Sequence, residues 1–243
     1  MNLITDQCME KIFSIHIPKT AGTFFGQILQ SINPDILFFN YGLESPGTRI
    51  YIQNRLVEPP VGKSHQTFFF DYLKRKDKGV AIMHGHVWEK KFYIANPDAK
   101  LICWLREPAQ RLYSHYEFFK RQPHPGNERY ENFKSRKQTF LEFATDQLNV
   151  NRQTTILDGI SKNELFFVGI VEKVNPSLNL FQNIFNKDIS VNETFSLNKN
   201  QNRNSESYKI SKEDFSNIKE RNLLDYQHYH EIVRTYQKID KSI

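Results

Sequence analysis

Residues 11–29 read KIFSIHIPKTAGTFFGQIL, and this stretch decides the fold. Its first part, residues 12–17, is rich in β-branched and aromatic side chains, which is typical of a buried strand. Pro18 lacks a backbone donor and closes the strand, Gly22 permits a tight turn, and Thr23 is a suitable N-cap for a following helix. The stretch therefore predicts a strand, a loop of small residues and a helix.

The loop places a lysine where an anion can bind. The first N–H groups of a helix have no intrahelical partners, and the helix dipole adds partial positive charge beside them. Lys19 adds a full charge, although it precedes the glycine, unlike the lysine of the Gly-x-x-x-x-Gly-Lys-Ser/Thr loop of NTPases. The loop predicts a phosphate or sulfate site; the alternative is that Lys19 is an exposed loop residue.

A second apolar segment, residues 100–105 (KLICWL), predicts another strand that ends at Arg106. Pro108 suits the first turn of a helix over residues 109–121, and Ser114 lies two turns into that helix. Ligands of open parallel sheets collect outside the carboxyl ends of the strands. Arg106 and Ser114 could hold a second phosphate there. The alternatives are a surface arginine paired with a nearby glutamate and an ordinary helical serine.

These two segments resemble motifs of sulfotransferases that use 3′-phosphoadenosine 5′-phosphosulfate (PAPS). Residues 17–23 (IPKTAGT) resemble the loop that binds the 5′-phosphosulfate. Residues 105–116 (LREPAQRLYSHY) resemble the 3′-phosphate motif, with its arginine and serine eight residues apart. Residues 84–87 (HGHV) and 151–154 (NRQT) resemble the His-Gly-His and the Asn/Gln/Thr segments of the heparan sulfate 2-O-sulfotransferase-like branch.

The resemblance implies a single α/β domain, residues 1–243, with a P-loop-like parallel sheet of about five strands flanked by helices. It implies PAPS as the sulfuryl donor and a hydroxyl acceptor, taken to be a carbohydrate; a lipid-linked sugar, polysaccharide or small metabolite would fit as well. A late basic loop would close over the 3′-phosphate through Arg203 or Lys199. The expected donor-binding residues are Pro18, Lys19, Thr20, Ala21, Gly22, Thr23, Phe24, Arg106, Ser114 and Arg203.

The chemistry predicted for this site is in-line sulfuryl transfer without a metal, because a lysine can hold the bridging oxygen. Lys19 is assigned that role, and a histidine is the natural base for a hydroxyl acceptor. His84 and His86 end a predicted strand two residues apart and so face the same way, while Gly85 leaves room for a ligand. Either histidine can be the base, with His84 preferred. His16 is expected to be a core residue or to line the donor site.

The composition of the chain limits which ligands, which cysteine chemistry and which compartment are expected. The 243 residues carry a net charge of +6 and a pI near 9.1, which suits a polyanionic ligand, and no nucleic-acid-binding signature appears. Cys103 lies within a predicted strand and is expected to be buried and inert; no disulfide with Cys8 and no zinc spacing are suggested. No window approaches a membrane span and the N-terminus has no anchor pattern, so the expectation is a soluble, cytoplasmic, bacterial enzyme.

The remaining segments alternate between strands and helices, which predicts a parallel sheet covered on both faces. Residues 1–10 are expected to be flexible, and residues 207–243 to form C-terminal helices. Further strands are predicted at residues 35–41, 79–84 and 165–171, and further helices at 64–76, 139–148, 176–185 and 211–238. The sequence also predicts a loop that can contain a short helix at 42–61, a mobile excursion at 123–136 and a polar loop at 191–206.

Two other function classes compete with the sulfotransferase. A P-loop nucleotide kinase or NTPase would need the Gly-Lys-Ser/Thr order and a strand-end aspartate for magnesium, and the sequence has neither. A non-catalytic nucleotide-binding module would keep the fold but lose the chemistry. The joint presence of Lys19, His84, His86, Arg106 and Ser114 argues against that loss. The acceptor and the oligomeric state stay open.

Overall fold

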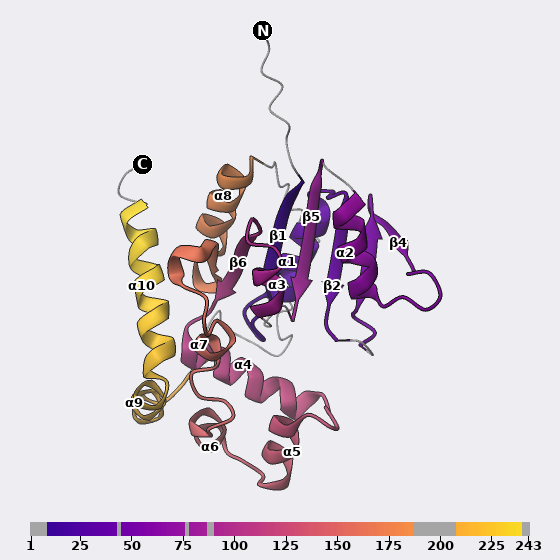
Figure 1. Ribbon diagram of the computed structural model, residues 1–243. Helices are drawn as coiled ribbons and strands as arrows, with labels where there is room; N and C mark the ends of the chain where they lie inside the picture. The colour runs from indigo at the N-terminus through magenta and orange to yellow at the C-terminus, as the bar shows by residue number, and fades with distance from the viewer. Residues whose placement is uncertain (1–8, 43–44, 76–77, 87–89, 187–207, 240–243) are drawn as a thin grey trace.

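The computed structural model describes residues 9–42, 45–75, 78–86, 90–186 and 208–239. A seven-stranded sheet in the order β4-β3-β2-β5-β1-β6-β7 forms its centre (Figure 1). The strands are β1 (Glu10–Ile15), β2 (Ile36–Asn40), β3 (Arg49–Ile52), β4 (Arg55–Val57), β5 (Val80–Gly85), β6 (Lys100–Leu105) and β7 (Leu165–Ile170). The five strands β2, β5, β1, β6 and β7 pair in parallel. The α/β fold with a parallel sheet is therefore confirmed.

The sheet has two strands beyond the parallel ones that were expected, because an antiparallel hairpin adds β3 and β4 at one edge. Both strands lie within residues 42–61, which were predicted to be a loop that can contain a short helix. The hairpin turns at Gln53 and Asn54, which have φ of 47° and 61°. Two consecutive positive φ values are the geometry of a tight hairpin turn, which glycine usually marks. Because this turn lacks glycine, the sequence carried no strong signal for it.

Helices cover both faces of the sheet, as the alternation of strands and helices predicted. Phe25 of α1 and Phe181 of α8 pack on one face, and Phe69 of α2 and Phe92 of α3 pack on the other. The helices are α1 (Gly22–Ser31), α2 (His65–Arg75), α3 (Lys90–Ile94), α4 (Pro108–Arg121), α5 (Glu128–Ser135), α6 (Phe140–Thr145), α7 (Arg152–Ile156), α8 (Val174–Phe185), α9 (Lys212–Arg221) and α10 (Leu223–Ile239), with 3₁₀ turns at Lys162–Glu164 and Val171–Lys173.

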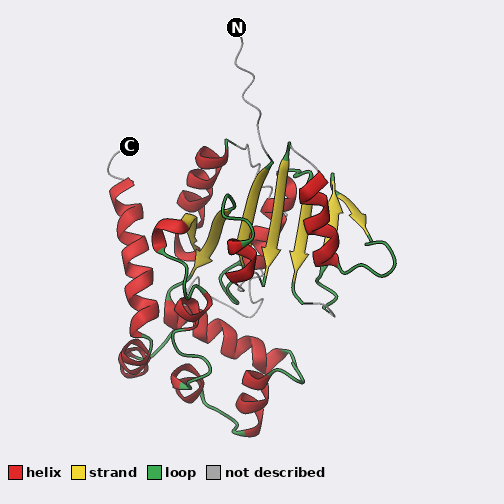
Figure 2. Cartoon of the chain, viewed as in Figure 1, coloured by secondary structure: helices red, strands yellow, loops and turns green. Residues whose placement is uncertain are grey.

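A separate helical cluster lies beyond the carboxyl ends of the parallel strands, whose arrowheads point toward it in Figure 2. Its core joins Leu112 of α4, Phe143 of α6 and Ile218 of α9. Helix α10 then runs back along the sheet, where Tyr229 packs against Ile170 and its neighbours. The helical cluster and α10 thus enclose the sheet edge at which the predicted anion-binding loops lie.

Residues 123–136, predicted to be an excursion without regular structure, contain helix α5. Asn127 caps it by accepting a hydrogen bond from the Tyr130 N–H at 3.2 Å. Tyr130 is buried, and its ring lies edge-on to Phe119 at 5.4 Å between centroids. The sequence did not predict this helix, because two prolines and a glycine directly before it are typical of a loop. The periodic segment that remains after them is short.

We predict that Gly85→Ala lowers the free energy of unfolding by about 3 kcal/mol or more. Gly85 has φ of +136°, and a Cβ there would lie 2.1 Å from the Asn40 carbonyl oxygen. Urea unfolding measures the change. Gly62→Ala is the matched control, since Gly62 has φ of +84° with nothing within 4 Å of its Cβ position. The control should lose about 1 kcal/mol; an equal loss in both variants would contradict the close approach.

Candidate active site

The loop after β1 presents backbone N–H groups without side-chain caps. Lys19 and Ala21 are in left-handed conformations, with φ of 71° and 63°. Ala21 occupies the N-cap of α1 and makes no side-chain hydrogen bond, so the prediction that Thr23 caps the helix is wrong. Thr23 instead lies exposed within the first turn. Alternating left-handed residues before a helix form a concave site for an anion, and non-glycine residues there carry backbone strain.

Gly22 allows the loop to lie directly against two histidines. A Cβ at Gly22 would lie 1.9 Å from the ring of His16, so only glycine fits at this position. The Gly22 carbonyl oxygen also accepts a hydrogen bond from the His84 ring at 3.0 Å. His16 stacks on His84 with 5.5 Å between ring centroids. The anion loop and the histidine segment are therefore packed into one unit.

The Lys19 ammonium points toward α4. Its Nζ atom lies 3.9 Å from the centroid of the Phe118 ring, a cation–π contact. Burial, followed by the nearby positive charges of Arg121 and Arg106, lowers the pKa of Lys19 to about 8. An anion bound beside Lys19 would raise this pKa again, because a negative charge favours the charged form of the amine.

Arg106 joins the second predicted phosphate motif to the first. Its Nη1 atom donates to the carbonyl oxygen of Lys19 at 3.3 Å, and the side chain is largely buried. Their strands are neighbours, because β1 pairs with β6 in parallel. Glu172 lies on the other side of the guanidinium, with Oε1 3.9 Å from Nε. The structure thus brings Lys19 and Arg106 to one place at the carboxyl edge of the sheet.

Ser114 is buried on the face of α4 that meets this loop. It lies one turn before Phe118, the residue under Lys19, and residues four apart share a helix face. Arg111, three residues before Ser114, is fully buried and donates to the Asn149 carbonyl oxygen at 3.3 Å. Burial lowers the pKa of Arg111 to about 10. This face of α4 therefore adds a hydroxyl and a second guanidinium to the region.

The two histidines of the His-Gly-His segment have different environments. His84 is buried, with Nδ1 2.8 Å from the Ser14 hydroxyl and Nε2 3.0 Å from the Gly22 carbonyl. Because a carbonyl only accepts, Nε2 carries the proton and Nδ1 accepts from Ser14. Burial lowers the pKa of His84 to about 4, so the ring is neutral near pH 7. Both ring nitrogens of His84 are thus engaged within the protein.

His86 lies beyond the end of β5, where its side chain is partly exposed. Its backbone N–H donates to the Asn40 carbonyl oxygen at 2.6 Å, and its ring lies edge-on to Tyr41 at 5.4 Å between centroids. Burial, and then the charge of Arg129, lowers the pKa of His86 below its usual value. A neutral, partly accessible imidazole at pH 7 is suited to accept a proton.

Arg129 of α5 is a site residue that the sequence analysis missed. One terminal nitrogen is buried and makes no hydrogen bond within the part of the chain that is described. Burial and the charge of Arg152 lower its pKa to about 10. No motif marked Arg129, because its helix was not predicted; tertiary packing alone brings it near His86.

Gln153, in the Asn/Gln/Thr segment, supports Arg106 through the backbone. Its side-chain oxygen accepts from the Arg106 N–H at 3.0 Å, and its amide nitrogen donates to the Arg106 carbonyl oxygen at 2.9 Å. Asp225 of α10 accepts hydrogen bonds from the N–H groups of Gln153 and Thr154. The segment thus fixes the strand end that carries Arg106.

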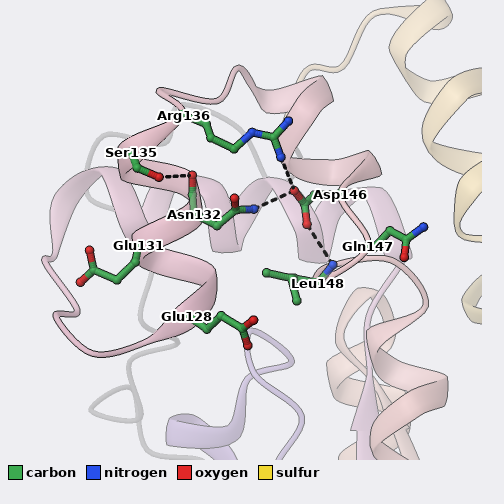
Figure 3. A pocket seen from close by; sticks show the side chains of 8 residues that line it. All are labelled: Glu128, Glu131, Asn132, Ser135, Arg136, Asp146, Gln147 and Leu148. Carbon is green, nitrogen blue, oxygen red and sulfur yellow. Dashed lines mark hydrogen bonds and ion pairs between the residues drawn. The ribbon is translucent and has the colours of Figure 1, made fainter.

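A surface hollow of about 580 Å³ lies between α5 and the segment after α6, and Figure 3 shows the side chains that line it. None of the predicted site residues lines it. Asp146 accepts hydrogen bonds there from Asn132 at 2.8 Å and the Leu148 N–H at 2.9 Å, and pairs with Arg136 at 3.4 Å. The hydrogen bonds and the ion pair of Asp146 therefore connect α5, the helix that carries Arg129, to the segment after α6.

Other predicted residues have different outcomes. Cys103 is buried, as predicted, and burial raises its pKa to about 12. Arg203 and Lys199 lie outside the described residues. Thr20 is buried, and its hydroxyl donates to the Ile17 carbonyl at 2.8 Å. None of the helices in the described ranges combines the length and apolar character that a membrane span requires.

No protein-family model matches the chain, and no curated protein matches it. Solved structures with a similar fold include a sulfotransferase from Alicyclobacillus acidocaldarius, with 14% identity over 93% of this chain and 96% of that chain, and a TM-score of 0.47. Mouse sulfotransferase SULT7A1 complexed with PAP has 14% identity over 77% of this chain, and a TM-score of 0.40. This chain spans 62% of the mouse protein. At these values neither likeness establishes a family or an activity.

We predict that Lys19→Met is more stable than the wild type at pH 7, by about 1–2 kcal/mol, because it removes a buried charge. The pKa of Lys19 falls from 10.5 to about 8 on folding, so between these values the unfolded chain binds the extra proton and wild-type stability rises with pH. The advantage of the variant should shrink toward pH 10. Urea unfolding across this range measures it.

Lys74→Met is the control, because the Lys74 side chain is 77% exposed. It should match the wild type at each pH. A Lys19→Met protein that is less stable than the wild type at pH 7 would show that the ammonium is well solvated or paired.

Proposed function

We propose that this protein is a sulfotransferase that moves the sulfuryl group of PAPS to a hydroxyl acceptor. The observation that carries the proposal is the hydrogen bond from Arg106 to the Lys19 carbonyl oxygen, because it joins two separate anion-binding segments into one site. PAPS has anionic groups at its 5′ and 3′ ends. A site in which two cationic segments adjoin is suited to such a donor, and the motifs of both segments support it.

The loop of Lys19 would hold the 5′-phosphosulfate. The uncapped N–H groups of the first turn of α1 and the helix dipole are directed to one point, and Lys19 adds an ammonium there. Sulfuryl transfer develops negative charge on the leaving phosphate, which these fixed donors stabilise. Removal of the Lys19 charge should raise the barrier by about 3 kcal/mol, roughly a hundredfold in rate.

Arg106 and Ser114 would bind the 3′-phosphate. Arg106 offers a charged fork, and Ser114 offers a hydroxyl from the buried face of α4. Arg203 or Lys199 would complete the site from the segment after α8. These groups distinguish PAPS from nucleotides that lack a 3′-phosphate.

His86 is the base that we favour. His84 has both ring nitrogens in hydrogen bonds to Ser14 and Gly22, so using it as a base would require a rearrangement of the core. His86 lies two residues further on, partly exposed and with a lowered pKa. In this proposal His84 holds the anion loop against β5, and His86 takes the proton from the acceptor hydroxyl as it attacks sulfur in line. The acceptor is taken to be a carbohydrate.

We predict that the wild type binds 3′-phosphoadenosine 5′-phosphate (PAP) at least about tenfold more tightly than AMP, because the 3′-phosphate gains charge-assisted hydrogen bonds. Arg106→Ala should remove most of this preference and leave AMP affinity nearly unchanged. Isothermal titration calorimetry measures both ligands. Arg136→Ala is the control, since Arg136 is an exposed arginine paired with Asp146. Equal wild-type affinities for PAP and AMP would refute the proposed function.

We predict that His86→Asn lowers sulfuryl transfer by about a hundredfold or more while PAP affinity is retained. Transfer from ³⁵S-labelled PAPS is measured with a panel of mono- and polysaccharides, and the acceptor with the highest wild-type rate is used for the variants. Because the pKa of His86 lies below 6.5, the wild-type rate should rise with pH to a plateau reached before pH 7.5. His65→Asn is the control, because His65 begins α2 and lies beside Glu58. Unchanged transfer by His86→Asn would exclude His86 as the base.

A further inference from the structure

We infer that Tyr229 of α10, acting through Glu172, is a positioning residue for the Arg106 guanidinium, an inference that rests on the proposed function. Tyr229 and Glu172 are 57 residues apart, and Glu172 and Arg106 are brought together by neighbouring strands β7 and β6. Neither Tyr229 nor Glu172 is part of the phosphate motifs of the sequence. The inference is that α10 helps to set the affinity for the 3′-phosphate.

The contacts form a continuous path. The Tyr229 hydroxyl donates to Oε2 of Glu172 at 3.0 Å. Oε1 of the same carboxylate lies 3.9 Å from Nε of Arg106, and both carboxylate oxygens accept from the Glu107 N–H, at 3.1 and 3.2 Å. Glu172 is therefore held from two sides, by a phenol and by a backbone amide. A carboxylate held in this way restricts the positions that a guanidinium beside it can take, because the two charges attract each other.

The direction is the one that phosphate binding needs. Glu172 faces the Nε edge of Arg106, and Nη1 at the far end donates to the Lys19 carbonyl oxygen. The terminal nitrogens are thus turned toward the anion loop. Without Glu172 on the Nε edge, a long arginine side chain would sample other rotamers, and the bound phosphate would have to select one of them.

Neighbouring residues of α10 support the same strand end. Asp225 accepts from the N–H of Gln153, the residue whose side-chain amide brackets the Arg106 backbone. The Tyr226 hydroxyl donates to the carboxylate of Glu107. Tyr229 is three residues after Tyr226 and four after Asp225, so it is a neighbour of each of them on the surface of α10. Helix α10 therefore supports Arg106 in three ways: through Gln153 at the Arg106 backbone, through the neighbouring Glu107, and through the counter-ion Glu172.

The charge of Glu172 also depends on this support. Burial raises the pKa of Glu172, whereas the Glu107 N–H, Arg106 and the Tyr229 hydroxyl lower it. Loss of the Tyr229 hydroxyl removes one of the groups that keep the carboxylate ionised. Arg106 would then face a counter-ion with a less defined position.

The experiment compares PAP with AMP, because only PAP has the 3′-phosphate that Arg106 would bind. Calorimetry is carried out on the full chain with four proteins: wild type, Tyr229→Phe, Glu172→Gln and the double variant. Tyr229→Phe removes one hydroxyl and keeps the packing of the ring. Tyr72→Phe is the matched control, because Tyr72 lies on α2, which packs on β2 and β3 at the other end of the sheet. Melting temperatures are recorded beside the affinities.

We expect Tyr229→Phe and Glu172→Gln each to weaken PAP by about fivefold, the loss that one such hydrogen bond implies, and to change AMP affinity less than twofold. The double variant should lose little more than Glu172→Gln alone, because both changes act through one carboxylate. Tyr72→Phe should bind both ligands as the wild type does.

Three results would overturn the inference. PAP and AMP affinities that fall together, or a fall in melting temperature alone, would assign Tyr229 a purely structural role. Strictly additive losses in the double variant would show that Tyr229 does not act through Glu172. If Tyr229→Phe fails to fold, Glu172→Gln decides alone, and an unchanged PAP-to-AMP ratio refutes the inference. A wild type that binds PAP and AMP equally would refute the proposed function itself. If the wild type prefers PAP, a negative result with the variants refutes only the inference about Tyr229.

Discussion

The main electrostatic feature of the structure is a convergence of like charges at one sheet edge. Parallel pairing of β1 with β6 places the loop of Lys19 beside Arg106, and helix packing adds Arg111 and Arg129 to the same region. Burial and mutual repulsion lower the pKa values of Lys19, Arg111 and Arg129. Buried cations with few carboxylates are costly, and proteins keep such arrangements where an anion compensates them in the functional state.

The scaffold around these charges is rigid because three segments share close contacts. Ser14 lies opposite His84 in the register of β1 and β5, and His84 bonds the Gly22 carbonyl oxygen at the start of α1. Gly85 allows the chain to pass directly beside Asn40 on β2. Groups held in this way lose little entropy when a ligand binds, which is the condition for strong electrostatic stabilisation of developing charge.

The C-terminal helix makes a different contribution. It carries none of the residues that would touch the nucleotide, yet its side chains reach Glu107, Gln153 and Glu172, all of which contact Arg106 or its neighbour. The helical cluster of α4, α6 and α9 holds the beginning of α10 in place. The site is therefore built from the sheet edge on one side and from helices that lie far along the chain on the other.

The sequence by itself determined the five parallel strands, the helices after β1 and β6, and the two candidate anion-binding segments. Each is a local pattern: an apolar run, a proline or glycine at its end, and charged residues at fixed spacing. The edge hairpin and α5 were missed because a turn without glycine and a segment rich in proline gave misleading local signals. Only the tertiary structure decided that His84 is enclosed while His86 is partly exposed, that Arg129 lies near His86, and that Tyr229 bonds Glu172. Those outcomes depend on strand register and on contacts between residues far apart in the chain, such as Tyr226 and Glu107, 119 residues apart, which no local pattern encodes.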